Sequence, residues 1–242
     1  MDIFNLRFPQ SALRPATAGS SGRPLVIFDC NGVLVDSESI ASTVLAHAAT
    51  RAGFPLSAET VARRFHGRRP ADVLAVIEAS MGQKLPAGFA SAVAGETLRR
   101  FRSELRALPH AVHALTWIRG PKAVASSSPI DRVRTSLDAV GLLRFFGPRL
   151  FSASNVAKGK PAPDLFQLAA ETMRVRPADC IVVEDSVPGV MAAASAGMRP
   201  IGFVGASQTP SKLARDLTAA GARTVVADMR VLKSSILELR GW

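Results

Sequence analysis

The feature that most constrains the fold of this 242-residue chain is a series of short, continuous apolar runs that end at polar residues. The first run is Leu25-Val26-Ile27-Phe28, which ends at Asp29. Similar runs recur at 123–125, 181–183, 201–204 and 224–226. Uninterrupted apolar runs of this length are typical of strands buried on both faces of a parallel sheet. Helical patterns lie between the later runs, at 163–173 and 186–196. This alternation predicts an α/β fold with a doubly wound parallel sheet.

The stretch 38–114 differs from the rest, because it contains no convincing strand and its apolar residues recur at helical spacing. Three sets of these residues predict three helices: Ile40, Val44, Leu45 and Ala48; Val73, Leu74 and Ile77; and Phe89, Val93, Phe101, Leu105 and Leu108. Pro109 is predicted to close the third helix. We therefore expect a loose tail at 1–23, a Rossmann-like core made of 24–37 and 115–242, and an inserted α-helical cap domain at 38–114.

The composition is that of a globular protein. Hydrophobic residues make up 48% and charged residues 20%, which excludes general disorder. No apolar run reaches the roughly 18 residues of a membrane helix, and the N-terminal segment has no apolar region of signal-peptide length. Cys30 and Cys180 lie far apart in apolar runs, which argues against a disulfide framework and against a cysteine zinc site. We expect a cytoplasmic protein with no membrane partner.

The net charge of +11 arises from 30 Lys and Arg against 19 Asp and Glu, and it is spread along the chain. Dispersed positive charge suits anionic small molecules. A nucleic-acid reader usually has a basic stripe or a known motif, and the sequence contains neither. We therefore expect a small anionic partner and no specific nucleic-acid partner. The sequence does not indicate an oligomeric state.

Polar and charged residues follow the predicted strands directly. They are Asp29 and Asn31 after the first run, Ser126 and Ser127 after the second, Lys160 after a weaker predicted strand near Leu150, and Glu184 and Asp185 after the run at 181–183. In a parallel α/β sheet, ligands bind at the carboxyl ends of the strands, so these side chains should share one site. Carboxylates, carbonyls and substrate phosphate are ligands that Mg²⁺ prefers, and an aspartate can serve as a nucleophile in phosphoryl transfer.

Four stretches carry a resemblance to a known family: FDCNGVLVDSE, ASSSP, GKPAPDLF and VVEDSVPGV. In order and spacing they resemble the four motifs of the haloacid dehalogenase superfamily, in the branch of small phosphatases and β-phosphoglucomutase-like enzymes with a helical cap. The resemblance covers roughly 24–242. It implies a Mg²⁺-dependent phosphatase that hydrolyses a small, sugar-phosphate-like monoester through an aspartyl-phosphate intermediate. The implied partner is a small phosphorylated metabolite.

The resemblance also implies roles for individual residues. Asp29 resembles the nucleophile that takes the phosphoryl group, and Lys160 resembles the lysine that pairs with the nucleophile and the phosphate. Ser126 resembles the phosphate-binding hydroxyl, and we group Ser127 with it as a substrate-binding residue.

A metal site is implied at the same strand ends. Asp29 and Asp185 resemble Mg²⁺ ligands, and Glu184 resembles either a further ligand or the orienting neighbour of Asp185. The backbone carbonyl of Asn31 should complete the share of the metal shell that the protein provides.

The chain departs from the family pattern at Asn31, where the phosphatases and mutases have a second aspartate that protonates the leaving oxygen and then activates water. An asparagine can donate and accept hydrogen bonds but cannot exchange a proton at neutral pH. Loss of a positioned general acid–base typically costs about 10²–10⁴-fold in rate. Asn31 is either natural or introduced, and the chain is either a slow or specialised enzyme or a phosphate-binding pseudo-enzyme.

Other branches of the superfamily fit less well. The Glu184-Asp185 pair favours a metal-dependent reaction over dehalogenation, and Lys84 is the only insert lysine that could serve a phosphonate hydrolase. The segment 39–42 lacks the histidine of the sugar-phosphate mutases, so hydrolysis is favoured and a phosphomutase is the alternative.

Two further predictions concern the insert. The segment 65–70 joins two predicted helices and holds Arg68 and Arg69, and we expect one of these arginines to contact the substrate through its planar guanidinium. Asp36 and Ser37 precede the first insert helix, and we predict that they cap it.

Overall fold

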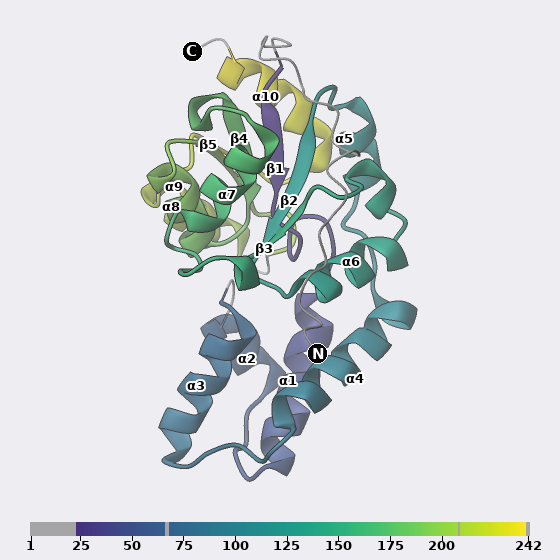
Figure 1. Ribbon diagram of the computed structural model, residues 1–242, viewed down its shortest axis with the longest axis vertical. Helices are drawn as coiled ribbons and strands as arrows, with labels where there is room; N and C mark the ends of the chain where they lie inside the picture. The colour runs from purple at the N-terminus through teal and green to yellow at the C-terminus, as the bar shows by residue number, and fades with distance from the viewer. Residues whose placement is uncertain (1–22, 66–67, 208, 241–242) are drawn as a thin grey trace, which may run out of the picture.

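The structure is a computed structural model that describes residues 23–65, 68–207 and 209–240. A six-stranded sheet forms its centre, with strand order β3-β2-β1-β4-β5-β6 and every pair of neighbours parallel. The strands are β1 (Leu25–Phe28), β2 (Lys122–Ser126), β3 (Leu150–Ser152), β4 (Cys180–Glu184), β5 (Arg199–Phe203) and β6 (Thr224–Val226). The predicted α/β fold with a doubly wound parallel sheet is confirmed (Figure 1). The tail expected at 1–23 lies outside the described residues up to residue 22.

The central strand β1 shows why the apolar runs form this sheet. All four of its residues are buried, and its side chains alternate between two separate apolar clusters. Val26 and Phe28 pack into one cluster, and Leu25 and Ile27 pack into the other. Burial of apolar surface on both faces is the main favourable contribution to folding, at about 25 cal/mol per Å². An uninterrupted apolar run therefore belongs at the middle of the sheet.

Helices cover both faces of the sheet. The first face is covered by α5 (Ala111–Trp117), α6 (Ile130–Ala139) and α10 (Leu232–Arg240), and the second by α7 (Asp164–Met173) and α8 (Val187–Ser195). Helix α9 (Pro210–Ala219) packs beside α8 through a smaller apolar cluster. Short 3₁₀ turns lie at Leu143–Phe145, Ala153–Asn155, Pro177–Asp179 and Met229–Val231. Within the described residues, no helix is long and apolar enough to cross a membrane.

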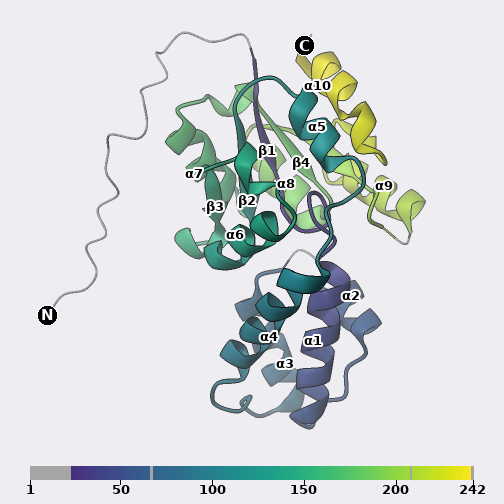
Figure 2. The same ribbon diagram turned by 90° about the vertical axis from the view of Figure 1, so that its right-hand side faces the viewer.

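Four helices form an insert between β1 and α5: α1 (Glu38–Arg51), α2 (Ala58–Phe65), α3 (Pro70–Met81) and α4 (Phe89–Glu104). Apolar side chains of α1, α2 and α3 form a cluster that includes Val61, Phe65 and Ile77. Val44 of α1 and Phe101 of α4 instead belong to the cluster on the first face of the sheet. Figure 1 and Figure 2 show the insert beyond the carboxyl ends of the strands. The insert therefore faces the edge of the sheet at which the sequence places the charged residues. The boundaries of a separate cap domain stay a prediction.

The third of the three predicted insert helices corresponds to α4 and is shorter than predicted. Helix α4 ends at Glu104 and does not continue to Leu108. Leu105 is extended, and the chain that follows pairs with the loop after β1. The N–H of Leu108 donates to the carbonyl of Leu34, and the N–H of Asp36 donates to the carbonyl of Arg106. These backbone hydrogen bonds replace helical ones, so Leu105 and Leu108 are buried as extended residues although their spacing is helical.

Candidate active site

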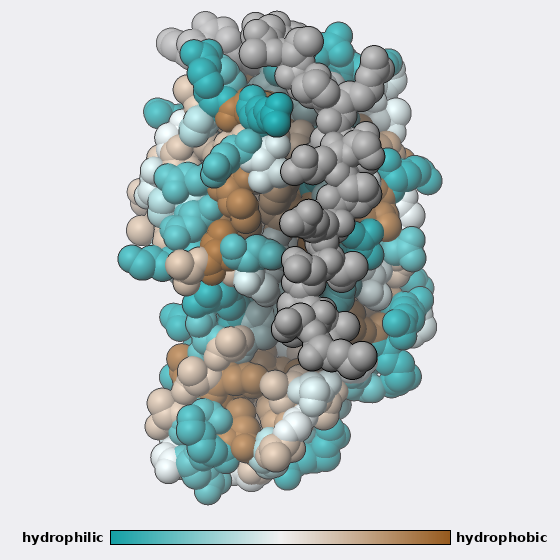
Figure 3. Space-filling model, viewed as in Figure 1, coloured by the Kyte–Doolittle hydropathy of each residue, from teal (hydrophilic) through white to brown (hydrophobic). Residues whose placement is uncertain are grey.

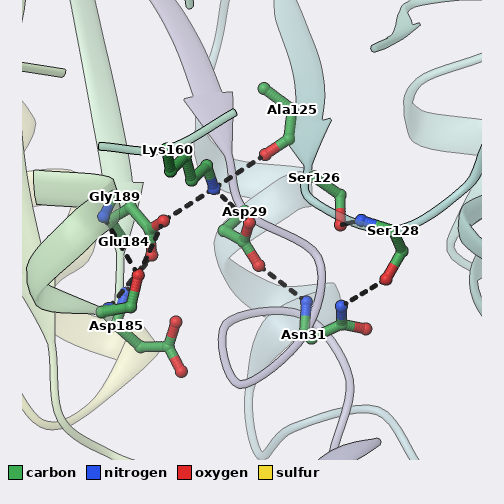
Figure 4. A network of polar contacts seen from close by, with 10 residues as sticks. Asp29, Asn31, Ala125, Ser126, Ser128, Lys160, Glu184, Asp185 and Gly189 are labelled. Atoms are coloured by element: carbon green, nitrogen blue, oxygen red, sulfur yellow. Dashed lines mark hydrogen bonds and ion pairs between the residues drawn. The ribbon is translucent and has the colours of Figure 1, made fainter. Parts of the chain in front are cut away.

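Asp29 is the first residue after β1, and its position is fixed by the sheet. Its N–H donates to the carbonyl of Val183 on β4, which directs the buried carboxylate out of the strand end. The Lys160 ammonium lies 2.5 Å from Oδ1 of Asp29 and 2.7 Å from Oε1 of Glu184, and it also donates to the carbonyl of Ala125. Figure 4 shows this ammonium between the two carboxylates. Lys160 therefore ties three strands together at one point.

Glu184 is held on several sides. Its Oε1 accepts from Lys160 and from the Ser186 hydroxyl, and its Oε2 accepts from the backbone N–H groups of Asp185 (2.7 Å) and Ser186 (3.1 Å). Although burial opposes ionisation, the Lys160 charge and these hydrogen bonds hold the pKa of Glu184 below its usual value. A carboxylate whose oxygens are already engaged positions its neighbours better than it binds a ligand.

Two glycines allow the carboxylates to approach the backbone. A Cβ added to Gly189 would lie 1.5 Å from Oε1 of Glu184, and one added to Gly32 would lie 1.9 Å from Oδ2 of Asp185. Gly32 also has a positive φ of 74°, which favours glycine. The sequence prediction missed both residues, although they stand inside the motif stretches NGV and PGV.

Three buried carboxylates form an acidic cluster: each of Asp29, Glu184 and Asp185 offers an oxygen, and these oxygens lie within 4.8 Å of one another. The ammonium of Lys160 pairs with two of these carboxylates, those of Asp29 and Glu184. Burial, together with the charges of Glu184 and Asp185, raises the pKa of Asp29 to about 7 although Lys160 acts against this. Burial lowers the pKa of Lys160, but the two carboxylates beside it outweigh burial and raise it. Buried carboxylate oxygens that lie this close together fit a hard divalent cation.

The side chain of Asn31 is fixed by two serines. Its Nδ2 donates to the Ser128 hydroxyl (3.0 Å), and its Oδ1 accepts from the Ser37 hydroxyl (2.8 Å). The backbone N–H of Asn31 donates to Oδ2 of Asp29 (2.8 Å). Ser37 is the N-cap residue of α1, as predicted, but its side chain forms no capping hydrogen bond. Its hydroxyl is buried and donates toward Asn31, which a sequence argument based on capping preference could not reveal.

The three serines at the end of β2, Ser126 to Ser128, differ in their access to the cavity. Ser127 and Ser128 line a cavity beside Asp29, whereas Ser126 is fully buried, and its hydroxyl accepts from the N–H of Ser128. The hydroxyl of Ser152 on β3 donates to the carbonyl of Ser128 and so holds the same loop. The phosphate-binding role expected of Ser126 and Ser127 stays a prediction.

The cavity has a volume of about 540 Å³ and runs from the carboxylates into the insert. Its far wall is mostly apolar and comes from the insert helices: Leu45, Val61, Phe65, Val73, Leu74, Val93 and Leu98. In Figure 3, hydrophobic residues gather over the insert in the lower half of the molecule. The substrate side of this cavity is therefore built mainly by the insert, and the charged side by the core.

The two arginines predicted to face the substrate differ in the structure. Arg68 is exposed and lines the cavity. Arg69 is bound to Asp72 by two hydrogen bonds (2.9 and 3.1 Å), and its aliphatic part packs against Gly159 next to the Lys160 loop. Residues 66 and 67 of the same segment lie outside the described residues. The geometry thus favours Arg68 over Arg69 as a substrate contact.

The doubly wound parallel sheet with charged residues at its carboxyl edge is that of a Rossmann-like α/β enzyme. A sequence profile described as "haloacid dehalogenase-like hydrolase" matches residues 24–197. The chain belongs to the haloacid dehalogenase-like hydrolase family.

Individual relatives agree with this assignment. A 6-phosphogluconate phosphatase of Escherichia coli (strain K12) is 35% identical over 179 residues, which cover 74% of this chain and 81% of that protein. A haloacid dehalogenase-like protein of unknown function from Agrobacterium tumefaciens has 36% identity and a TM-score of 0.75, over 90% of this chain and 99% of that one. A family hydrolase from Deinococcus radiodurans, crystallised with phosphate and sodium, has 29% identity and a TM-score of 0.71, over 90% and 96%.

Proposed function

We propose that the protein is a Mg²⁺-dependent phosphatase that hydrolyses a small, sugar-phosphate-like monoester through an aspartyl phosphate at Asp29. The observation that carries this proposal is the buried Asp29 carboxylate, which Lys160 pairs with and which lies within 4.8 Å of the carboxylates of Glu184 and Asp185. The name of the phosphogluconate phosphatase relative supports the substrate class. The crystallised relative with bound phosphate supports a phosphate ligand.

Asp29 acts as the nucleophile in this proposal. Its carboxylate oxygen forms a bond to phosphorus, and the bond between phosphorus and the ester oxygen breaks. Water then attacks the phosphorus of the aspartyl phosphate, which releases inorganic phosphate and restores Asp29. Lys160 neutralises charge on Asp29 and on the phosphoryl oxygens, while Glu184 keeps Lys160 in place.

The cation is proposed to bind Asp29, Asp185 and the backbone carbonyl of Asn31. These are hard oxygen donors, and the carboxylate oxygens of the acidic cluster lie within 4.8 Å of one another. When bound, Mg²⁺ supplies neutralisation of the phosphoryl oxygens. Glu184 is then the orienting neighbour, because its oxygens are engaged by Lys160, Ser186 and backbone N–H groups.

Asn31 sets the rate in this proposal. Its amide lies between Ser37 and Ser128 and cannot act as a general acid at neutral pH. Solvent water must therefore protonate the leaving oxygen. The insert acts as a cap that excludes bulk water over the cavity, which strengthens the charge interactions inside it. The absence of histidine in 39–42 favours hydrolysis over a mutase reaction.

The test is phosphate release from a panel of sugar phosphates and polyol phosphates, with Mg²⁺ and with EDTA, for the wild-type protein and for Asp29→Asn. We expect slow release that requires Mg²⁺ and that Asp29→Asn abolishes. Release that is unchanged in Asp29→Asn or in EDTA would falsify the proposal. Binding of sugar phosphates without release, even in Asn31→Asp, would support the pseudo-enzyme instead.

A further inference from the structure

Arg132 lies in the first turn of α6, on the core side of the cavity, and it lines the same cavity as Asp29 and Lys160. Helix α6 packs against α4 of the insert. The guanidinium carbon stands 5.0 Å from the centre of the Phe101 ring on α4, and this ring is fully buried. One face of the guanidinium is therefore covered by an aromatic ring, and the residue also has access to the cavity.

The charge of Arg132 has no direct partner. Within the part of the chain that the structure describes, its side chain forms no ion pair and no hydrogen bond, and its Nε is completely buried. Its two Nη nitrogens keep access to the cavity, because Nε is the one nitrogen of this side chain that is both buried and unbonded. Leaving a buried donor unsatisfied costs on the order of 1–3 kcal/mol, so an orphaned arginine needs a reason.

Several other arginines of the chain are paired. Arg69, Arg99, Arg100, Arg176 and Arg230 each donate to an aspartate or glutamate. Glu38 and Asp131 also line the cavity, but neither carboxylate pairs with Arg132. Burial lowers the pKa of Arg132, and the charge of Glu38 acts in the opposite direction but is outweighed. The position is therefore electrostatically unsatisfied until an anion arrives.

We propose that Arg132 binds a carboxylate at the end of the substrate opposite the phosphate, so that the enzyme prefers phosphate monoesters of small hydroxy acids. This inference rests on the proposed function and names its substrate class. The phosphate end already has Lys160 and a cation site, which leaves the Arg132 charge for a second anion. The two Nη nitrogens match the two oxygens of a carboxylate, and the Phe101 ring fixes the plane of the guanidinium.

The test compares two ligands that differ only in this group, 6-phospho-D-gluconate and D-glucitol 6-phosphate. Both kcat/KM and, in an Asp29→Asn background, Kd are measured with Mg²⁺ for the wild type, for Arg132→Met and for Arg132→Lys. The matched control is Arg134→Met, because Arg134 is exposed on the same helix and does not line the cavity.

We expect Arg132→Met to lower kcat/KM for phosphogluconate, and to raise its Kd, by about 10- to 100-fold. This is the size of the contribution from a charge-assisted hydrogen-bond pair. The glucitol ester and the Arg134→Met control should change by less than about twofold. Arg132→Lys keeps the charge without the planar fork and should recover part of the loss. It also serves as the test variant should Arg132→Met fail to fold, since a loss confined to phosphogluconate remains the expected result.

Equal losses for both esters, or no loss for phosphogluconate, overturn the proposal, as does a wild-type protein that binds neither ester. Arg132-dependent binding of phosphogluconate without phosphate release keeps the anion site and refutes the phosphatase. Phosphate release from both esters that does not depend on Arg132 supports the phosphatase and refutes the anion site.

Discussion

Asn31 occupies the position from which the leaving oxygen would be protonated, and the two serines around it determine what a substitution there can do. In Asn31→Asp the Ser37 hydroxyl can keep donating to one oxygen, and the Ser128 hydroxyl can turn from acceptor to donor for the other. We expect kcat to rise by about 10²–10⁴-fold and KM to change much less, because the gained proton transfer belongs to the transition state. Steady-state phosphate release measures both quantities.

Peptide mass analysis of this segment must accompany the assay of Asn31→Asp, because the Asn31-Gly32 sequence is prone to deamidation. A wild-type sample verified as asparagine that already turns over at ordinary enzyme rates, with no gain from the substitution, would contradict the role assigned to position 31.

Asp185 decides whether the acidic cluster binds a cation. In Asp185→Ala we expect the rise in Tm on adding Mg²⁺ to disappear, because a ligand that binds only the folded state raises its stability. Differential scanning fluorimetry with and without Mg²⁺ is the measurement, and Asp36→Ala is the control because Asp36 is exposed and outside the cluster. An unchanged Mg²⁺ shift in Asp185→Ala would remove this residue from the metal site.

The raised pKa of Asp29 gives the cluster a pH dependence. Without a cation, burial raises the pKa of Asp29 to about 7 in the folded state, whereas the unfolded state releases this proton near the ordinary aspartate pKa of 3.8. The folded state therefore binds more protons between these values, and this group stabilises the protein as the pH falls from 7 toward 4. Protons also compete with the cation, so we expect the Mg²⁺-induced shift in Tm to shrink as the pH falls below 7.

The control for this pH dependence is Asp29→Asn, in which the metal-free contribution of Asp29 to the pH profile should vanish. A Mg²⁺ shift that grows as the pH falls from 7.5 to 5.5 would show that the Asp29 carboxyl does not compete for the cation.

At the scale of elements, β1, β2, β4, β5 and β6 were predictable because each contains a short apolar run. The end of α4 was not, because Leu105 and Leu108 continue the helical spacing while backbone hydrogen bonds to 34–36 draw them into an extended segment. The role of Ser37 depends on a contact with Asn31 that capping preferences cannot encode. Arg132 carries no local motif at all, and only packing against α4 makes it stand out.

Helix α8 follows β4 closely, and Gly189 in its first turn lets the Glu184 side chain approach the helix backbone. In Gly189→Ala the new Cβ would overlap Oε1 of Glu184, so the carboxylate must move and Lys160 loses a partner. We expect a loss of stability of about 1–3 kcal/mol and a fall in activity. Gly95→Ala is the matched control, because Gly95 occupies an exposed position of α4 and the added Cβ meets nothing within 4 Å. This substitution should stabilise the helix by about 1 kcal/mol.

Chemical denaturation and phosphate release report the two effects of Gly189→Ala separately. A Gly189→Ala protein that is as stable and as active as the wild type would mean that Glu184 is not held in place as described.

At the scale of the whole molecule, the cavity belongs to neither the core nor the insert alone. The core supplies the carboxylates, Lys160 and Arg132, and the insert supplies the apolar far wall and Arg68. The core could be predicted in more detail than the insert, because strand-end chemistry is local in sequence. Which insert side chains face the cavity depends instead on how the insert helices pack against one another and against the core.

Arg68 tests whether the insert selects the substrate. It is exposed, lines the cavity and follows α2, whereas Arg69 is bound to Asp72 and packs against Gly159. In Arg68→Ala we expect KM for a preferred sugar phosphate to rise by about tenfold with little change in kcat, because one charged hydrogen bond to the bound substrate is lost. Arg63→Ala on exposed α2 is the control, because it removes a neighbouring positive charge outside the cavity. Equal KM values for Arg68→Ala and the wild type across the panel would leave the choice of substrate to the core and to the apolar wall of the insert.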